Sequence, residues 1–397
     1  MTFKFIKEHK KLIYFVFSFY LAMKISSYTQ ILYFQSNQQL NLFSLYYSVM
    51  AIAGAFSFLI SNQLVSYPIS VLHKIFVVIY SFALILRIFV NSPLLVILSA
   101  ILSGVSASIV LMLLRRWIYV TTDKNKEERG KIHSIRFFFM QLAVITSSAI
   151  AGILFGGLTH FFTSNKSYII ILLFSGILML TNLMVKLPDI LDGEKKDSKF
   201  YFFPKKNKKL SIIMYIMYIF LGISVAIVTS ILPAIIHGSG WSVENSSFIV
   251  SGLAIFTLLF SYFYQQKWIT DHANIVFLIS QLFSVLVCCL SLFLFQEKIT
   301  VILIGLVTEA TLAGFFILKE LLEYEIIPVK QRQIFFGLLQ SSFLIGDSLA
   351  SPIGSFLYLT RGLSGLITIY SLIVIGSSFA FYLLLENSKI QDIIAKQ

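Results

Sequence analysis

Three charged side chains lie in the middle of long apolar stretches of this sequence: Lys24, Glu309 and Asp347. A charge at the centre of a bilayer costs roughly 2.5 to 3.5 kcal/mol, so each should face a watery cavity or a partner group. Because transfer out of water disfavours the charged form of a carboxyl group, a buried glutamate or aspartate can take up a proton near neutral pH. Glu309 and Asp347 are therefore candidates for binding and releasing protons.

Lys24 is a candidate for contact with an anionic or amphiphilic solute. In a helix, Tyr20 and Tyr28 lie one turn on either side of it, so the ammonium group lies between two phenol rings on one face. Such rings can contact a cation through their faces. The alternative is that Lys24 pairs internally and holds helices together, because unpaired membrane charges are rare.

The two carboxylates also have a structural alternative. Glu309 lies beside Thr308 and near Thr311, and Asp347 lies within LIGDSLASP. Either side chain could simply hydrogen-bond hydroxyl groups on a neighbouring helix. Arg87 lies about one turn from the end of its apolar stretch, where a long side chain can reach the interface, so the sequence predicts no function for it.

The composition indicates which elements must position these residues. Of the 397 residues, 57% are hydrophobic and only 12% are charged, whereas soluble proteins carry charges at about 25% of positions. A membrane-spanning helix needs about 20 apolar residues, so roughly twelve of them would use most of the chain. We therefore predict an all-α integral membrane protein without a soluble catalytic domain. The net charge of +13 then reflects membrane topology rather than nucleic-acid binding.

Twelve apolar stretches, separated by polar or turn-forming residues, are the predicted transmembrane helices. They cover residues 12–34, 42–64, 72–90, 94–114, 135–158, 167–187, 211–236, 246–264, 274–295, 299–318, 334–358 and 362–385. The charged stretch 188–210 divides them into two sets of six. We predict a six-helix domain at 1–187, a linker at 188–210 and a second six-helix domain at 211–397.

The basic residues predict the orientation of the chain. Nearly all of the 31 Lys and Arg fall in segments on one side, and only Lys166, Lys298 and Arg361 lie in loops on the other. Because cytoplasmic loops carry the excess of basic residues, both termini and the linker should be cytoplasmic in a multi-pass protein of the cell membrane. The lysines of the linker are either a topogenic connector or a site for anionic lipid headgroups.

The two halves contain a repeat at an offset of 203 residues. Arg129 lies before the fifth stretch and Arg332 before the eleventh, in EERGKIHS and VKQRQIFFG respectively. Small residues follow each arginine about twenty positions later, in SAIAG, which continues to Gly156 and Gly157, and in SPIGS. The small residues in question are Gly152, Gly156, Gly157, Ser351, Pro352 and Gly354.

On these motifs the chain resembles the major facilitator superfamily. The resemblance implies two pseudo-symmetric six-helix bundles that expose a central cavity to alternate sides of the membrane. It also implies that the small-residue motifs take part in the conformational change. Asp271 in KWITDHAN occupies the acidic position of the family's loop motif, so it could pair with Arg332 and close the cytoplasmic side, or be an ordinary solvated charge.

We therefore predict a secondary active transporter, not an enzyme, with small-molecule substrate, protons and membrane lipids as partners. The function we predict first is proton-coupled efflux of an amphiphilic or lipophilic compound. A proton-coupled importer of an anionic nutrient, or a lipid-handling membrane protein, is the alternative. The two cysteines are adjacent, so we expect no metal site or other cofactor. No Walker motif is present, so we expect no ATP hydrolysis. We also expect a monomer.

Overall fold

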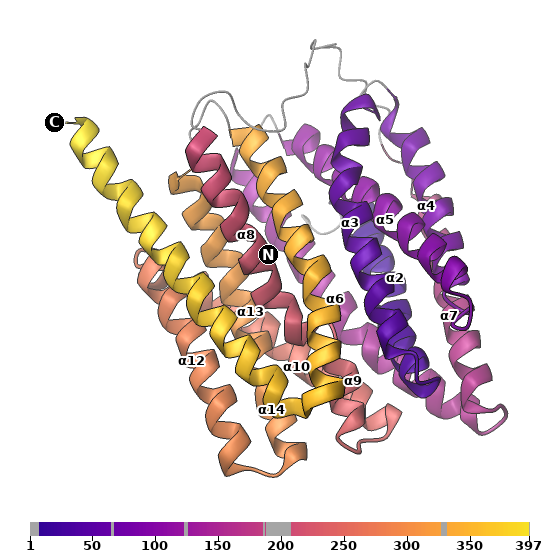
Figure 1. The fold of residues 1–397 in the computed structure, drawn as a ribbon. Coiled ribbons are helices and arrows are strands. Elements are labelled where there is room, and N and C mark those ends of the chain that lie inside the picture. Colours follow the sequence, from indigo (N-terminus) through magenta and orange to yellow (C-terminus); the bar gives the residue numbers. More distant parts are fainter. Residues whose placement is uncertain are drawn as a thin grey trace. The chain divides into compact units, whose positions relative to one another are not determined.

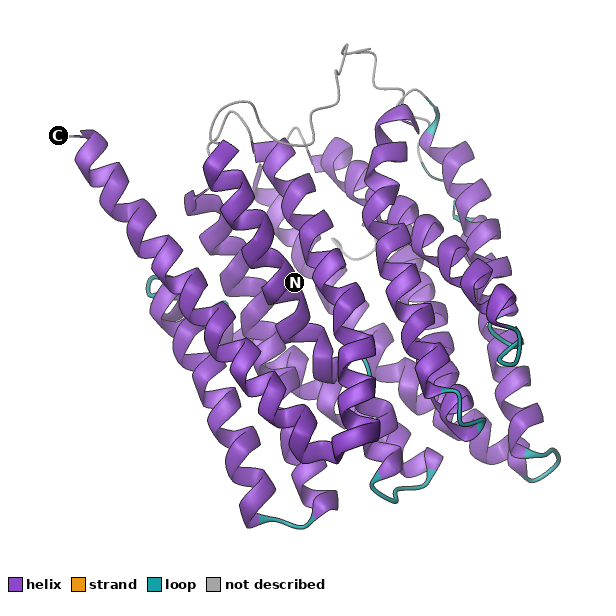
Figure 2. Ribbon diagram, viewed as in Figure 1, coloured by secondary structure: helices purple, strands orange, loops and turns teal. Residues whose placement is uncertain are grey.

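All secondary structure in the described part of the chain is helical (Figure 2). The computed structural model describes residues 8–64, 67–122, 126–185, 187, 208–326 and 332–396. Within these ranges, 11 helices are long and apolar enough to cross a membrane. The chain is therefore an all-helical integral membrane protein, as its composition predicts.

The chain divides into two compact units, which are described separately. One unit comprises Met1–Ser198 and Ser242–Gly252, and the other comprises Lys199–Trp241 and Leu253–Gln397. The boundary at residue 198 falls in the predicted linker 188–210, most of which lies outside the described residues. The predicted domain limits at 187 and 211 stay a prediction.

The helices of the first unit match the six predicted stretches (Figure 1). They are α2 (Lys10–Ser36), α3 (Leu40–Leu64), α4 (Ile69–Leu86), α5 (Pro93–Thr122), α6 (Lys126–Thr159) and α7 (Ser164–Leu180), followed by the 3₁₀ turn η1 (Thr181–Met184). Helix α6 begins nine residues before the predicted apolar stretch 135–158, because Glu, Lys and Arg favour helix in its polar first turns. Hydropathy thus locates the apolar part of each helix rather than its ends.

The second unit departs from the predicted stretches at two places. Its helices are α8 (Lys208–Thr229), α9 (Leu232–Gly238), α10 (Val243–Tyr264), α11 (Lys267–Thr270), α12 (Ala273–Leu294), α13 (Glu297–Ile326) and α14 (Arg332–Lys396), of which the first turns of α10 belong to the first unit. The predicted helix 211–236 is broken between α8 and α9, where Pro233 lies in the first turn of the second piece and offers no backbone N–H.

The second departure concerns the predicted break between 358 and 362. Helix α14 runs through it for 65 residues, but Gly362 has φ 66° and ψ −165°, so two helices meet there at a kink. Glycine adopts a positive φ without the steric penalty of a side chain. The predicted end of one helix and start of the next is therefore present as a kink rather than a loop.

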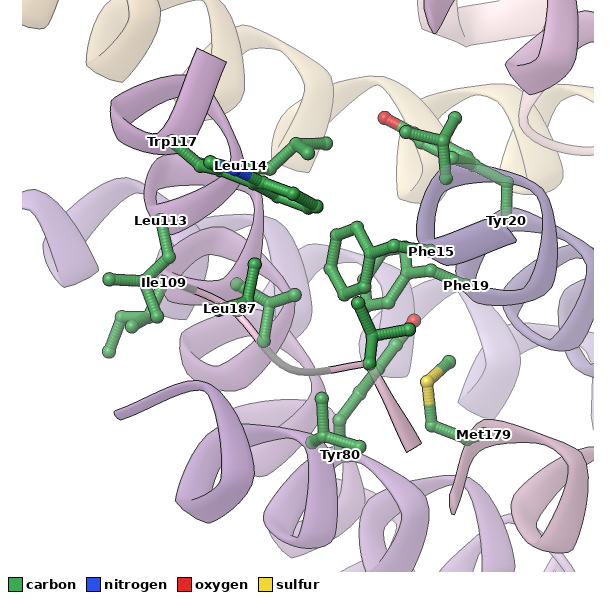
Figure 3. Packing of buried hydrophobic residues seen from close by; sticks show 14 of the residues in the cluster. Phe15, Phe19, Tyr20, Tyr80, Ile109, Leu113, Leu114, Trp117, Met179 and Leu187 are labelled. Carbon is green, nitrogen blue, oxygen red and sulfur yellow. The ribbon is translucent and has the colours of Figure 1, made fainter. Parts of the chain in front are cut away.

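An aromatic core holds α2 in the first unit (Figure 3). The ring of Phe15 lies 5.8 Å from that of Phe19 and 6.3 Å from that of Trp117 in α5. Phe19 in turn lies 5.6 Å from Tyr80 of α4. Since interlocking rings leave little room for movement, this core fixes the helix that carries Lys24.

Close backbone contact holds α8 against α14 in the second unit. A Cβ atom on Gly346 would collide with the carbonyl oxygen of Ile219, and one on Gly354 would collide with that of Ile227. Helices in a bilayer approach closely at small residues, because lipid tails supply no hydrophobic driving force between helices. These two glycines therefore set the distance between α8 and the part of α14 that carries Asp347.

Candidate functional site

Tyr20, Lys24 and Tyr28 share one face of α2, as their spacing predicts. Lys24 is half-buried, and both tyrosines are buried. Tyr20 packs edge-on against Phe19 at 5.7 Å in the aromatic core (Figure 3). The hydroxyl of Tyr28 donates a hydrogen bond to the carbonyl oxygen of Val243 at 3.2 Å. Tyr28 thus contacts the start of α10, while a role of this face in binding solute stays a prediction.

The sequence analysis missed Glu244 in the first turn of α10. Its carboxylate interacts electrostatically with the phenols of Tyr28 and Tyr168. It packs over Gly156 of α6, where a Cβ atom would lie 3.1 Å from the Cγ atom of Glu244. Glu244 lies next to polar loop residues at a helix start, so hydropathy does not distinguish it from an ordinary loop charge.

The small residues of α6 form a packing surface for α10. A Cβ atom on Gly152 would collide with Ser247, and the hydroxyls of Ser148 and Ser251 are hydrogen-bonded at 2.6 Å. Gly157, by contrast, has no atom within 4 Å of such a Cβ position. Two of the three predicted glycines of this motif therefore face α10, and the third does not.

We expect Gly152→Leu to destabilise the protein by about 1–3 kcal/mol, because the new side chain has no room beside Ser247. Gly157→Leu adds the same side chain to the same helix where there is space, so it should change stability by less than about 0.5 kcal/mol. Thermal unfolding of the solubilised protein measures both. Equal unfolding temperatures for the two variants would show that this surface does not require glycine.

Glu309 lies on α13, and its carboxylate is held by a neighbouring helix. The hydroxyl of Thr257 in α10 donates a hydrogen bond to Glu309 Oε2 at 2.7 Å. The hydroxyls of Thr308 and Thr311 bond carbonyl oxygens of their own helix, at 2.7 and 2.8 Å. The sequence analysis placed these threonines beside the carboxylate, and the structure adds a hydrogen bond to it from α10.

A small cavity that several polar side chains help to line lies beside this part of α13. Its volume is about 20 Å³, and its lining includes Ser224, Thr229, Gln281, Thr308, Thr311 and Tyr370. A site of this size and polarity can hold one water molecule. Hydroxyl and amide groups from α8, α12, α13 and α14 therefore converge one residue away from Glu309.

Asp347 lies at the crossing of α14 and α8. Its side chain is half-buried, and its backbone nitrogen would lie 3.0 Å from a Cβ atom on Gly222. It follows Gly346, which contacts the carbonyl oxygen of Ile219. Asp347 is therefore placed where the two helices cannot separate or rotate without disturbing it, and its part in proton binding stays a prediction.

Lys319 is a second cation that the sequence analysis did not single out, because its predicted apolar stretch ends at residue 318. Helix α13 continues past it, and its ammonium nitrogen lies 5.1 Å from the ring centre of Tyr218, 5.2 Å from that of Phe343 and 5.6 Å from that of Phe315. Three rings from α8, α13 and α14 thus surround one cation. Of these three ring contacts, the sequence indicates only the one between Phe315 and Lys319, which are four residues apart on one helix.

The prediction that the side chain of Arg87 reaches the membrane interface is wrong, because the side chain is buried. It is 1% exposed, donates a hydrogen bond to Ser26 Oγ at 2.9 Å, and lies 5.2 Å from the ring centre of Tyr46. The guanidinium also donates a hydrogen bond to the phenol oxygen of Tyr80. Because α4 ends at Leu86, Arg87 is the C-cap residue of that helix, and the backbone dipole favours a positive charge near a helix C-terminus. None of its partners in the described part of the chain is a carboxylate.

The predicted gating residues are described only in part. Asp271 is exposed at the end of α11, where its backbone N–H bonds the carbonyl oxygen of Lys267. Arg129 and Arg332 lie in the first turns of α6 and α14, but their side chains fall outside the described structure. The pair of Asp271 with Arg332 therefore stays a prediction. In the second small-residue motif, Ser351 is buried and Pro352 lies inside α14.

Sequence comparison with known families and curated proteins finds no match. Solved structures do match. The chain is similar to the nucleoside transporter NupG, with 17% identity, 95% of this chain and 98% of that chain covered, and a TM-score of 0.69. It is similar to a D-xylose–proton symporter, with 14% identity, coverage of 95% and 96%, and a TM-score of 0.67. A bacterial homolog of the human lysosomal transporter Spinster matches with 10% identity, coverage of 95% and 97%, and a TM-score of 0.64.

These structures are transporters of the major facilitator type, and the match extends over almost the whole of each chain. The chain therefore has the major facilitator fold, as the resemblance predicts, and membership of the superfamily stays a prediction. The proteins it matches belong to a class of transporters rather than enzymes.

Proposed function

We propose that this protein is a proton-coupled secondary transporter of a small molecule, with Glu309 as the proton-binding group. The observation that carries the proposal is the Thr257–Glu309 hydrogen bond of 2.7 Å, in a helix whose adjacent threonines line a polar cavity. A half-buried carboxylate that meets water on only one side at a time can bind a proton on one side of the membrane and release it on the other. One structural neighbour is described as a proton symporter.

The proposed architecture is twelve transmembrane helices in two six-helix bundles. It counts α14 as two spans because of the kink at Gly362, and α8 with α9 as one span. The distribution of basic residues supports cytoplasmic termini in a multi-pass protein of the cell membrane. We further propose a monomer in which Asp271 and Arg332 close the cytoplasmic side.

The proposed substrate is a polar molecule that forms hydrogen bonds. The cavity beside Glu309 is lined by hydroxyl and amide groups, including Ser224, Gln281 and Thr311. Two neighbours are named for nucleosides and for D-xylose, which are solutes of this kind. Uptake of such a solute is therefore the first candidate.

Efflux of an amphiphilic compound is the second candidate. It is supported by the aromatic surroundings of two half-buried lysines: the phenols of Tyr20 and Tyr28 on the face of Lys24, and the three rings around Lys319. Transport of radiolabelled nucleosides, sugars and amphiphilic dyes by reconstituted vesicles tests both. Saturable transport of only the dyes would favour efflux.

We expect Thr257→Val to raise the pH at which transport is half-maximal. The hydroxyl donates to the carboxylate, so it stabilises the charged form of Glu309, and its removal makes proton binding easier. A hydrogen bond to a charged group contributes about 1.5–3 kcal/mol, and 1.36 kcal/mol corresponds to about one pH unit. The shift should therefore be about one to two units upward.

The pH profile of transport in vesicles measures this shift. Thr300→Val is the matched control, because the hydroxyl of Thr300 in the same α13 donates to the carbonyl oxygens of Ser291 and Phe295 at the end of α12, and Thr300 lies nine residues before Glu309. A midpoint that stays in place in Thr257→Val would mean that this carboxylate is not the group that couples transport to protons.

A further inference from the structure

The second unit carries an apolar groove that the proposed transport mechanism does not use. The groove lies between α8 and the last part of α14 and has a volume of about 630 Å³. Ile213, Ile216 and Phe220 line it from α8, and Leu372, Gly376 and Ala380 line it from α14. Several of these side chains are half exposed, although they lie in helices apolar enough to cross a membrane. In a bilayer, lipid tails surround such a surface.

Small residues of α14 create the groove. A Cβ atom on Gly376 would meet no atom within 4 Å, so the space beside it is open. Ser377 is the one polar side chain from α14 in the lining, and its hydroxyl bonds the carbonyl oxygen of Val374 at 3.3 Å within its own helix. The groove therefore offers apolar surface with little demand for a polar ligand.

One end of the groove is positively charged. Lys209 precedes Ile213 by four residues and Phe220 by eleven, so it lies on the groove face of α8 about one turn beyond the groove. Lys208 and Lys209 are both exposed. Glu386, at the same end of α14, accepts a hydrogen bond from Asn274 of α12 at 2.9 Å, so its carboxylate is directed to another helix.

We propose that this groove binds one anionic phospholipid of the inner leaflet, with an acyl chain along α8 and α14 and the phosphate group at Lys208 and Lys209. The apolar groove fits a chain, and the lysines complement the charge of the headgroup. The basic side of a membrane protein is the cytoplasmic side, where anionic lipids provide the headgroups. In this proposal, Lys208 and Lys209 at the end of the linker bind the lipid phosphate group in addition to determining the membrane topology. This inference does not depend on the transported solute or on Glu309.

Native mass spectrometry of the full-length protein tests the proposal. The purified protein is mixed with equal amounts of phosphatidylglycerol and phosphatidylcholine, and the retained lipids are counted. We expect one tightly held phosphatidylglycerol and at least a fivefold preference for it. Inorganic phosphate at millimolar concentration should not displace it, because phosphate lacks the acyl chain. Retention of both lipids equally, or displacement by phosphate, would overturn the proposal.

Two variants separate the chain from the headgroup. Lys208→Gln with Lys209→Gln should remove the preference for phosphatidylglycerol, whereas Gly376→Phe should fill the groove and lower retention of either lipid at least fivefold. Gly252→Phe is the matched control, because a Cβ atom on this glycine of α10 also meets nothing within 4 Å. Should Gly376→Phe fail to fold, as judged by size-exclusion chromatography, Ala380→Leu replaces it. Wild-type retention in the folded groove variant would contradict the proposed site.

Discussion

Glu309→Gln is expected to reduce proton-driven accumulation of solute at least tenfold while solute still exchanges down its own gradient. Glutamine keeps the shape of the side chain and can still accept the hydrogen bond from Thr257, but it cannot release a proton. A transporter without its proton-binding group can still alternate between its two states, so it loses the driving force rather than the pathway. Accumulation and counterflow, measured on the same vesicles, separate these two effects.

Glu297→Gln is the matched control for this experiment. Glu297 lies on the same helix α13, but it is exposed in the first turn, where its charge is solvated. Its replacement should leave both accumulation and counterflow at wild-type levels. If Glu309→Gln still concentrated solute with the wild-type dependence on pH, the proton would have to be carried elsewhere, and Asp347 would be the next residue to test.

Arg87→Met should lower the stability of the first unit. It removes a buried hydrogen bond from a charged group to Ser26, worth about 1.5–3 kcal/mol, and the contact with the Tyr46 ring, worth up to about 2 kcal/mol. Relief from burying the charge offsets part of this loss. For a unit of this size we expect an unfolding temperature lower by roughly 5–10 °C.

Fluorescence-detected thermal unfolding of the solubilised protein measures this change. Arg361→Met is the control, because Arg361 is exposed, and it should shift the unfolding temperature by no more than about 1–2 °C. Arg87→Lys keeps the positive charge at the end of α4 but loses the planar fork of donors, so it should fall between the two. An unchanged unfolding temperature in Arg87→Met would show that the buried arginine does not hold α2, α3 and α4 together.

The membrane helices could be predicted because length and hydropathy are local properties of the sequence. Ten of the twelve predicted stretches fall in helices as expected or differ only at their ends, as at the start of α6, which continues as a helix through charged residues. The last two predicted stretches belong to that set as the two parts of α14, joined at a kink, whereas other departures, such as the division of 211–236 between α8 and α9, interrupt a stretch. The kink at Gly362 and the break before Pro233 depend on backbone dihedral angles, which hydropathy does not report. The sequence therefore predicts which segments cross the membrane better than it predicts their ends.

A residue of the candidate site could be predicted only where it is a charged residue among apolar neighbours in the sequence. Glu309 stands out as a charge within an apolar stretch, but its partner Thr257 lies 52 residues away on α10. Arg87 and Lys319 lie near the ends of apolar stretches, so their burial depends on rings from other helices, such as Tyr46 and Tyr218. Contacts between distant segments of this kind leave no periodic signal in a single sequence.

The central claim is that this chain couples solute movement to a proton gradient. Its most direct test is uptake by vesicles that contain the purified wild-type protein, with a panel of nucleosides, sugars and amphiphilic dyes, with an imposed pH gradient and after its collapse by a proton carrier. We expect at least one solute to accumulate above its external concentration only while the gradient persists, without ATP. Transport of a panel solute that only equilibrates, at the same rate with and without the gradient, would contradict the claim.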